Sequence, residues 1–257
     1  MELDQTVTSR IFLIRHGATE WSTRGLHTSV TDVPLSAEGE KQVRETKEKF
    51  VGPGKLIDPV DVRKVYCSPY QRARKTCEIL NFSCDGSYPV VEEHELPKNV
   101  GTTSQQTKQV RPIVYTDRLK EWDYGEYEGK TIEEVHELRR QRNQENGGPT
   151  WNIWLDGCEG GESPQQVSDR IDSLIREIIR DIDIRDPIPG GKTLPKAKNF
   201  VCIAHGHILA SLALRWARQP LRNGMRLLME TAGIAVLGFE HDNIDEPAII
   251  LSRSPHA

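Results

Sequence analysis

The sequence predicts an α/β protein, a three-layer α/β/α sandwich with a mostly parallel central sheet. One observation is that apolar runs of strand length, such as residues 11–14 and 200–204, end abruptly at polar residues. Runs of this kind are typical of strands that are buried on both faces. A second observation is that amphipathic helical patterns alternate with such runs along the chain. This alternation favours a sheet that is covered by helices on both sides.

Length and composition narrow the class of protein. With 257 residues, the chain is long enough for a sizeable core, and we expect one domain over residues 1–257. The net charge of -4 gives no basic character that would indicate nucleic-acid binding. No apolar run approaches the ~20 residues of a membrane span, so we expect neither nucleic acid nor a membrane as a partner. Homo-oligomerisation stays open.

The cysteines and the N-terminus indicate a compartment. Five cysteines form an odd set without a C-x-x-C pair, which favours unpaired thiols over a disulfide or zinc framework. Residues 1–10 lack the apolar core of a secretory signal. We therefore expect a cytoplasmic protein.

Two predicted strands end at histidines. The first strand runs into Arg15, His16 and Gly17, and the run at 200–204 ends in His205-Gly206-His207. In an open α/β sheet, ligands bind outside the carboxyl ends of the strands, so these side chains arrive where a ligand would lie. A single strand-end histidine is most often structural. Two such ends far apart in the chain indicate a shared site.

The first half of the chain contains two further predicted helices and a strand. Ser36 is expected to cap a helix that runs to about Phe50. Residues 62–67 read as a strand, after which Ser68 is expected to cap a helix with Pro69 at its first position. Arg72 then lies in the first turn, where backbone N–H groups favour an anion. It is either a solvated surface residue or an anion clamp.

The middle of the chain is less regular. Residues 84–116 are predicted to be an irregular insertion, with a short strand at 113–115. Residues 120–129 mix acidic with aromatic side chains. A partly desolvated carboxylate among aromatic rings has a raised pKa and acts as a general acid, but the spacing does not say which acid this is.

The second half begins with helices. Thr131 to Glu134 and Ser163 to Gln166 are capping boxes, and the latter opens the clearest amphipathic helix of the chain. Residues 208–218 are helical by pattern, and residues 234–239 are the last predicted strand.

The chemistry of these side chains favours a phosphoryl group as the ligand. His205 and His207 are two apart on what we expect to be an extended stretch, so they should face opposite ways and not share a metal. Arg15 beside His16 disfavours a cation, whereas guanidinium groups suit phosphate. With Arg72 and two histidines, the site offers the spread positive charge that phosphoryl transfer requires. We expect no metal and no cofactor, and the sequence has no G-x-x-x-x-G-K-[ST] motif.

Four motifs resemble the histidine phosphatase (phosphoglycerate mutase-like) superfamily. They are Arg15-His16-Gly17 with Thr19 and Trp21, Asp32-x-Pro34-Leu35-Ser36, Ser68-Pro69-x-x-Arg72-Ala73-x-x-Thr76 and Ala204-His205-Gly206-His207. The resemblance implies that His16 accepts the phosphoryl group as a phosphohistidine, while Arg15, Arg72 and His205 hold its oxygens. It implies that Glu121 protonates the leaving oxygen and then activates water. It also implies that a pocket is lined by Ser22, Thr28, Ser29, Tyr124 and Gly206.

A narrower resemblance concerns the yeast-type sedoheptulose-1,7-bisphosphatases. Residues 121–129, 151–162 and 243–248 resemble segments of that family. Two departures stand out. Ala210 occupies the position where that family carries an arginine suited to a second phosphate, and the segment between Arg218 and Ala232 is shorter.

The leading hypothesis is a metal-independent phosphatase that acts on a small phosphorylated metabolite through a phosphohistidine. A sugar phosphate or bisphosphate, sedoheptulose 1,7-bisphosphate included, is the expected substrate class. The alternative within the superfamily is a cofactor-dependent phosphoglycerate mutase, which must hold a second anionic group and keep water away. A non-catalytic phosphate-binding module requires a missing catalytic residue, yet all five implied catalytic residues are present.

Overall fold

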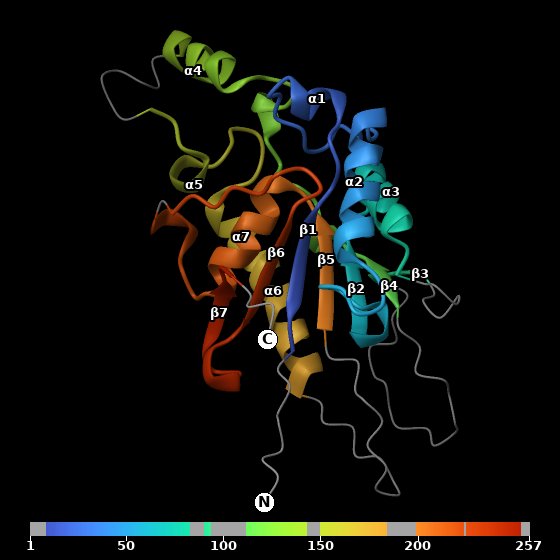
Figure 1. Cartoon of the computed structure of the whole chain (residues 1–257). Helices are drawn as coiled ribbons and strands as arrows, with labels where there is room; N and C mark the ends of the chain where they lie inside the picture. The colour runs from blue at the N-terminus through green and yellow to red at the C-terminus, as the bar shows by residue number, and fades with distance from the viewer. Residues whose placement is uncertain are drawn as a thin grey trace, which may run out of the picture.

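A central seven-stranded sheet organises the described part of the chain. The computed structural model describes residues 9–82, 90–93, 112–142, 150–183, 199–223 and 225–252. Within these residues the strand order is β3-β4-β2-β5-β1-β6-β7 (Figure 1). The strands are β1 (Ile11–Arg15), β2 (Val62–Cys67), β3 (Val90–Glu92), β4 (Ile113–Tyr115), β5 (Asn199–Ala204), β6 (Ile234–Phe239) and β7 (Pro247–Ile250).

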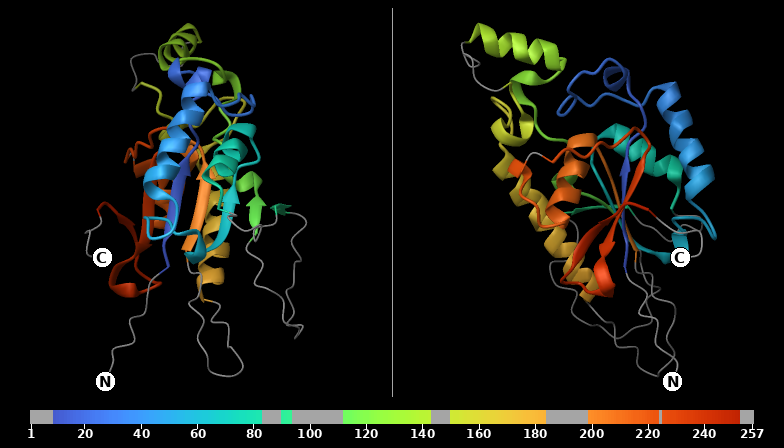
Figure 2. Two further views of the ribbon diagram at one scale, coloured as in Figure 1. Left: turned by 45° about the vertical axis from the view of Figure 1, so that its right-hand side comes forward. Right: turned by 60° about the vertical axis from the view of Figure 1, so that its left-hand side comes forward.

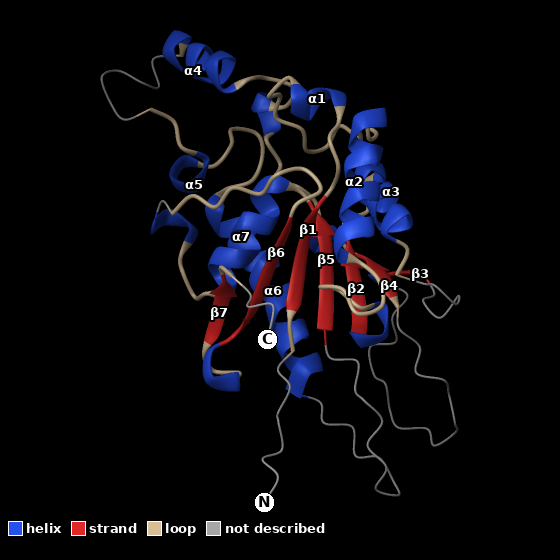
Figure 3. Cartoon of the chain, in the orientation of Figure 1, coloured by secondary structure: helices blue, strands red, loops and turns tan. Residues whose placement is uncertain are grey.

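Helices cover both faces of this sheet. They are α1 (Glu20–Thr23), α2 (Ala37–Phe50), α3 (Gln71–Leu80), α4 (Ile132–Gln141), α5 (Ile153–Asp156), α6 (Pro164–Asp183) and α7 (Gly206–Trp216). Seen along the sheet, α2 and α3 lie on one side and α6 and α7 on the other (Figure 2). The shorter α1, α4 and α5 lie beyond the upper end of the sheet (Figure 3). The predicted three-layer α/β/α sandwich is confirmed.

The sheet is mostly parallel, as predicted, with an antiparallel edge. Strands β3, β4, β2, β5 and β1 pair in parallel, whereas β6 is antiparallel to β1 and β7 is antiparallel to β6. Strand β7 was not expected from the sequence. It begins at Pro247, which has no backbone N–H to donate and therefore suits an edge strand.

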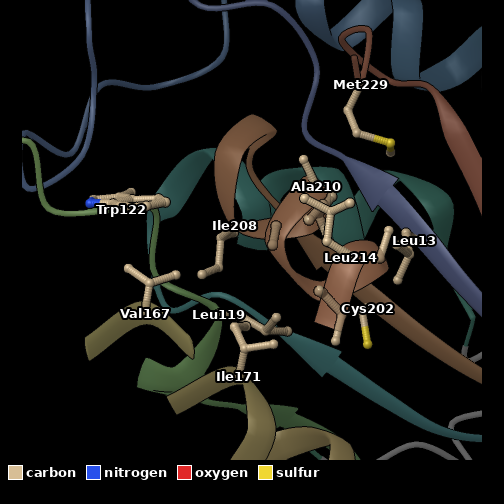
Figure 4. Close-up of a cluster of buried hydrophobic side chains, with 14 of the residues drawn as sticks. Leu13, Leu119, Trp122, Val167, Ile171, Cys202, Ile208, Ala210, Leu214 and Met229 are labelled. Carbon is tan, nitrogen blue, oxygen red and sulfur yellow. The ribbon is translucent and has the colours of Figure 1, made fainter. Parts of the chain in front are cut away.

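Strand β1 is buried on both faces because it separates two hydrophobic layers. Ile11 and Leu13 belong to the cluster with α6 and α7, whereas Phe12 and Ile14 belong to the cluster with α2 and α3. Successive side chains of a strand point to opposite faces, so each layer receives alternate residues. Figure 4 shows the first cluster, with Leu13 opposite residues of α6 and α7. This packing holds the carboxyl end of β1 rigidly.

Two helices begin at other residues than the sequence predicted. Helix α3 starts at Gln71 rather than Pro69, because the Ser68 hydroxyl bonds to His205 Nε2 at 2.8 Å instead of capping the helix. Asp32 Oδ1 accepts from Gln71 N at 2.8 Å in its place. Helix α7 starts at Gly206 rather than residue 208. His207 is therefore helical, and the premise that it lies on an extended stretch was wrong.

The predicted insertion at 84–116 lies largely outside the described residues. Of this segment, residues 90–93 and 112–116 are described. They contain β4, as predicted, and the unpredicted β3, which pairs with it in parallel. In the described residues, no helix has both the length and the apolar character needed to cross a membrane.

Candidate active site

A cavity of about 400 Å³ opens at the carboxyl ends of β1 and β5. Arg15 and His16 from the end of β1 line it, as do Gly206 and His207 from the start of α7. The lining also includes residues between Thr19 and Thr28, Glu121 and Tyr124 of the acidic-aromatic stretch, Trp154 and residues 226–229. Ligand sites of small molecules have volumes in this range, and open α/β sheets bind ligands at this edge.

His16 is held in one tautomer with a free ring nitrogen. Its Nδ1 lies 2.7 Å from the Gly17 carbonyl oxygen, which only accepts, so Nδ1 donates and Nε2 keeps its lone pair. The ring is buried, and burial lowers its pKa well below the usual value; the charges of Arg72 and Arg15 lower it further. A neutral imidazole with a free Nε2 is a competent nucleophile at neutral pH.

His205 lies beside His16 in the complementary tautomer. Arg72 Nε donates to His205 Nδ1 at 3.0 Å, so Nε2 carries the hydrogen that is donated to the Ser68 hydroxyl. Burial, Arg72 and His16 lower the pKa of His205 well below its usual value. The two rings meet edge to face, with their centroids 5.0 Å apart. His205 is thus held against the His16 ring in its neutral form.

Arg72 is fully buried, which decides between the two alternatives that the sequence left open. Its remaining N–H groups reach the backbone carbonyls of Ser29 at 3.2 Å, Thr31 at 3.3 Å and Thr28 at 3.4 Å. It is therefore not a solvated surface residue. Arg72 and His205 bond to one another behind His16, and neither lines the cavity directly.

Arg15 presents an unpaired donor next to His16. Its Nη1 donates to the Met229 carbonyl at 2.5 Å. Its Nε is buried and, within the described residues, has no hydrogen-bond partner. A buried N–H without a partner is costly, and a bound anion would satisfy it.

Among the acidic residues of the acidic-aromatic stretch, Glu121 is the one whose side chain lines the cavity. Its Oε1 accepts from the backbone N–H groups of Trp122 at 2.9 Å and Ile208 at 2.8 Å, and its Oε2 accepts from His207 N at 3.1 Å. The carboxyl group is buried at the N-terminus of α7, where helix N–H groups favour an acidic side chain. Glu128, an acid of the same stretch, has a structural role instead. Its carboxylate accepts hydrogen bonds from Ser29 N and Thr31 N and so holds the Ser29–Thr31 loop.

Four of the five predicted substrate-binding residues line the cavity: Ser22, Thr28, Tyr124 and Gly206. Ser29 does not. It is fully buried, its hydroxyl donates to Glu128 Oε2 at 2.6 Å, and the same oxygen accepts from Tyr124 N at 3.2 Å. Ser29 therefore holds the loop that contacts Arg72, and its hydroxyl is not directed to the cavity.

The structure also brings residues to the cavity that were not among the predicted catalytic or substrate-binding residues. They are His27, His207, Trp154 and the segment Arg226–Met229. Tyr124 OH lies 2.6 Å from His207 Nδ1, and the Tyr124 ring packs on His27 with centroids 4.8 Å apart. Burial lowers the pKa of His207 and raises that of Tyr124, so both are neutral. The His-Gly-His motif was the only signal for His207.

The site shows no arrangement of metal ligands within the described residues. Among the residues that the structure describes, no three histidine, cysteine, aspartate or glutamate side chains gather where they could hold a metal ion. His205 and His207 have different partners, Arg72 and Tyr124.

Fold and site together define a phosphoric monoester hydrolase: a buried histidine flanked by arginines at the carboxyl ends of a sheet, with a carboxyl group in the same cavity. The chain belongs to the histidine phosphatase superfamily (branch 1), whose family model matches residues 11–109 and 100–247.

Individual relatives agree with this membership. The chain is 30% identical to the sedoheptulose 1,7-bisphosphatase of Saccharomyces cerevisiae, over 96% of the chain and 93% of the relative. It is 32% identical to an acid phosphatase of Mycobacterium tuberculosis, over 90% and 87%. Among solved structures, an open reading frame product of Mycobacterium tuberculosis superposes with a TM-score of 0.66 at 27% identity, covering 95% of this chain and 96% of that one.

Proposed function

We propose that this protein hydrolyses a small phosphorylated metabolite, without a metal ion, through a phosphohistidine formed at His16. The observation that carries the proposal is the state of the His16 ring. Its Nδ1 hydrogen is engaged by the Gly17 carbonyl, its pKa is lowered, and its Nε2 is left to attack. The unpaired Arg15 Nε beside it supports a phosphate oxygen there.

In the proposed first step, His16 Nε2 attacks phosphorus in line with the ester oxygen. The N–P bond forms, the P–O bond breaks, and Glu121 gives its proton to the leaving oxygen. Glu121 Oε2 accepts a single hydrogen bond, whereas Oε1 accepts two, so Oε2 has the lone pair that would carry this proton. Arg15 binds an oxygen of the transferred group from the cavity wall, whereas Arg72, which His205 contacts and which does not line the cavity, stabilises that group through its nearby positive charge.

In the second step, Glu121 takes a proton from water, and the water oxygen attacks the phosphohistidine. The N–P bond breaks, and inorganic phosphate leaves with His16 again neutral. Because the pKa of His16 is lowered, its imidazole is neutral in the free enzyme. Release of phosphate therefore returns the enzyme to its starting form.

A sugar phosphate or bisphosphate is the proposed substrate class, and the name of the yeast relative supports it. The tyrosine, histidine and hydroxyl side chains of the lining suit a polyhydroxylated substrate. The Ala210 side chain is uncharged, so this position supplies no cation for a second phosphate. Ala210 is buried in the core with the residues of Figure 4 and does not line the cavity. We further propose that the protein acts in the cytoplasm, which the odd cysteine count favours.

The test is phosphate release, without added metal, from sedoheptulose 1,7-bisphosphate, fructose 1,6-bisphosphate, 3-phosphoglycerate and p-nitrophenyl phosphate. We expect turnover of at least one ester by the wild type and none by His16→Ala. The variant should keep the wild-type fold by circular dichroism, because a strand-end histidine contributes little to the core. Turnover by His16→Ala at the wild-type rate would refute the covalent mechanism. Isomerisation of 3-phosphoglycerate without phosphate release would favour the mutase, and binding without turnover would favour a binding module.

A further inference from the structure

The cavity contains a second arginine, which the proposed chemistry does not use. Arg15 and Arg226 both line it. Arg15 adjoins the nucleophile, whereas Arg226 is exposed and belongs to the segment Arg226–Met229, which lines the cavity and ends at the buried Met229. An arginine in a substrate cavity is a recognition element for a carboxylate or phosphate.

The Arg226 side chain is not bound by any other group of the described chain. Within the described chain it has no hydrogen bond and no ion pair, and its side chain is exposed. Its neighbours Leu227, Leu228 and Met229 line the same cavity and are apolar. Most other arginines near this site are held by protein groups; Arg72, for example, is bound by carbonyl oxygens and His205. The guanidinium of Arg226 is therefore available to a ligand.

The chain connection limits how far Arg226 lies from the phosphate site. The Met229 carbonyl accepts a hydrogen bond from Arg15 Nη1, which anchors this end of the segment at the site of reaction. Arg226 precedes Met229 by three residues, so their Cα atoms are at most about 10 Å apart. At this separation the Arg226 side chain reaches a second group of the substrate, one that lies several carbon atoms away from the reacting phosphate.

Several other polar side chains of the same cavity are uncharged. Tyr124 and His207 form a neutral hydrogen-bonded pair, since burial raises the pKa of the phenol and lowers that of the imidazole. Such a pair suits hydroxyl groups rather than a charge. The described lining thus combines two arginines with neutral polar groups.

We propose that Arg226 binds a second anionic group of the substrate, so that the enzyme selects doubly anionic metabolites whose anions lie at opposite ends of a hydroxylated chain. This inference rests on the proposed phosphatase function and assigns specificity to a residue outside the reacting group. Arg226 contacts the substrate but takes no part in bond making, so its loss should raise KM and leave kcat largely unchanged.

The test compares Arg226→Ala and Arg226→Lys with the wild type on fructose 1,6-bisphosphate, fructose 1-phosphate and p-nitrophenyl phosphate. We expect the wild type to favour the bisphosphate over the monophosphate. Arg226→Ala should raise KM for the bisphosphate roughly 10- to 100-fold, the loss of one charge-assisted contact, and change the other two substrates less than about twofold. Arg226→Lys should lie in between.

Arg222→Ala is the matched control. Arg222 is exposed and four residues away, but it lies outside the cavity, so its removal changes the net charge equally without touching the substrate. The inference is wrong if the wild type does not prefer the bisphosphate, if Arg226→Ala weakens all substrates alike, or if Arg222→Ala has the same effect. No phosphate release by the wild type from any of the three would instead refute the proposed function, and the inference with it.

Discussion

Replacing Glu121 with glutamine separates its chemical role from its structural role. The amide has nearly the shape of the carboxyl group but cannot give up a proton to a leaving oxygen. Its single oxygen can still accept from Trp122 N and Ile208 N, as Oε1 does in the wild type. The amide nitrogen then faces the N–H of His207, which leaves one donor without an acceptor.

The expected magnitudes follow from these contacts. Loss of a general acid costs about 100- to 10,000-fold in rate when the leaving group is poor. It costs little when the leaving group is a nitrophenolate, which departs without a proton. The unpaired His207 N–H should lower the free energy of unfolding by about 1–3 kcal/mol. The folded protein should nevertheless persist, because typical stabilities are about 5–15 kcal/mol.

The assay measures the rate of phosphoenzyme formation for p-nitrophenyl phosphate and for an alkyl phosphate, with urea unfolding in parallel. Glu128→Gln is the control. Glu128 is also a carboxylate held by N–H groups, those of Ser29 and Thr31, but it does not line the cavity. Its variant should loosen the loop that contacts Arg72 and slow both substrates by the same factor.

The refuting result is specific. If Glu121→Gln slows both substrates by the same factor, as Glu128→Gln should, then Glu121 only positions the start of α7 and is not the acid. A selective loss on the alkyl phosphate supports proton donation by Glu121 to the leaving oxygen.

Two further predictions concern Arg72 and pH. Arg72→Lys replaces a planar fork by a single ammonium, which cannot bond to His205 and to the loop carbonyls together. We expect kcat/KM to fall about 100- to 1,000-fold on every substrate, and an unchanged value would contradict the role of Arg72. The pKa values of His16, His205 and His207 are lowered in the folded state from the usual 6.5, so the unfolded chain binds more protons below pH 6.5. Stability should therefore decrease as pH falls from 6.5 toward the lowered values, by at most about 1.4 kcal/mol per pH unit for each histidine. Urea unfolding between pH 7.5 and 5.5 measures how the free energy of unfolding changes with pH. This slope should be smaller in His16→Ala than in the wild type. Equal slopes would contradict a lowered pKa of His16 in the folded protein.

The sequence predicted the layers and the strand ends because both follow from local patterns. In β1 four apolar residues follow one another without a break, which is typical of a strand buried on both faces, and in α6 apolar residues repeat with a period near 3.6. The short edge strands β3 and β7 were missed. They have three and four residues, too few to show a period.

The candidate site was predictable only in part. Arg15 is the last residue of β1 and His16 follows it directly, and both line the cavity. The choice of Glu121 among the acids of its stretch rested on the family resemblance, and the N–H groups that hold it include two from α7, 86 and 87 residues further along. Ser29 shows the opposite error. The family resemblance implied a substrate contact for Ser29, but Glu128 engages its hydroxyl.

The sequence by itself determined which elements form and which side chains stand at the strand ends, because side-chain periodicity acts on neighbouring residues. The tertiary structure alone decided which nitrogen of His16 is free, that Arg72 is buried rather than solvated, and that Arg226 lines the cavity with no partner among the described residues. Each of these depends on burial and on contacts between segments far apart in the chain. Such contacts form only when the whole sheet packs, so no local pattern records them.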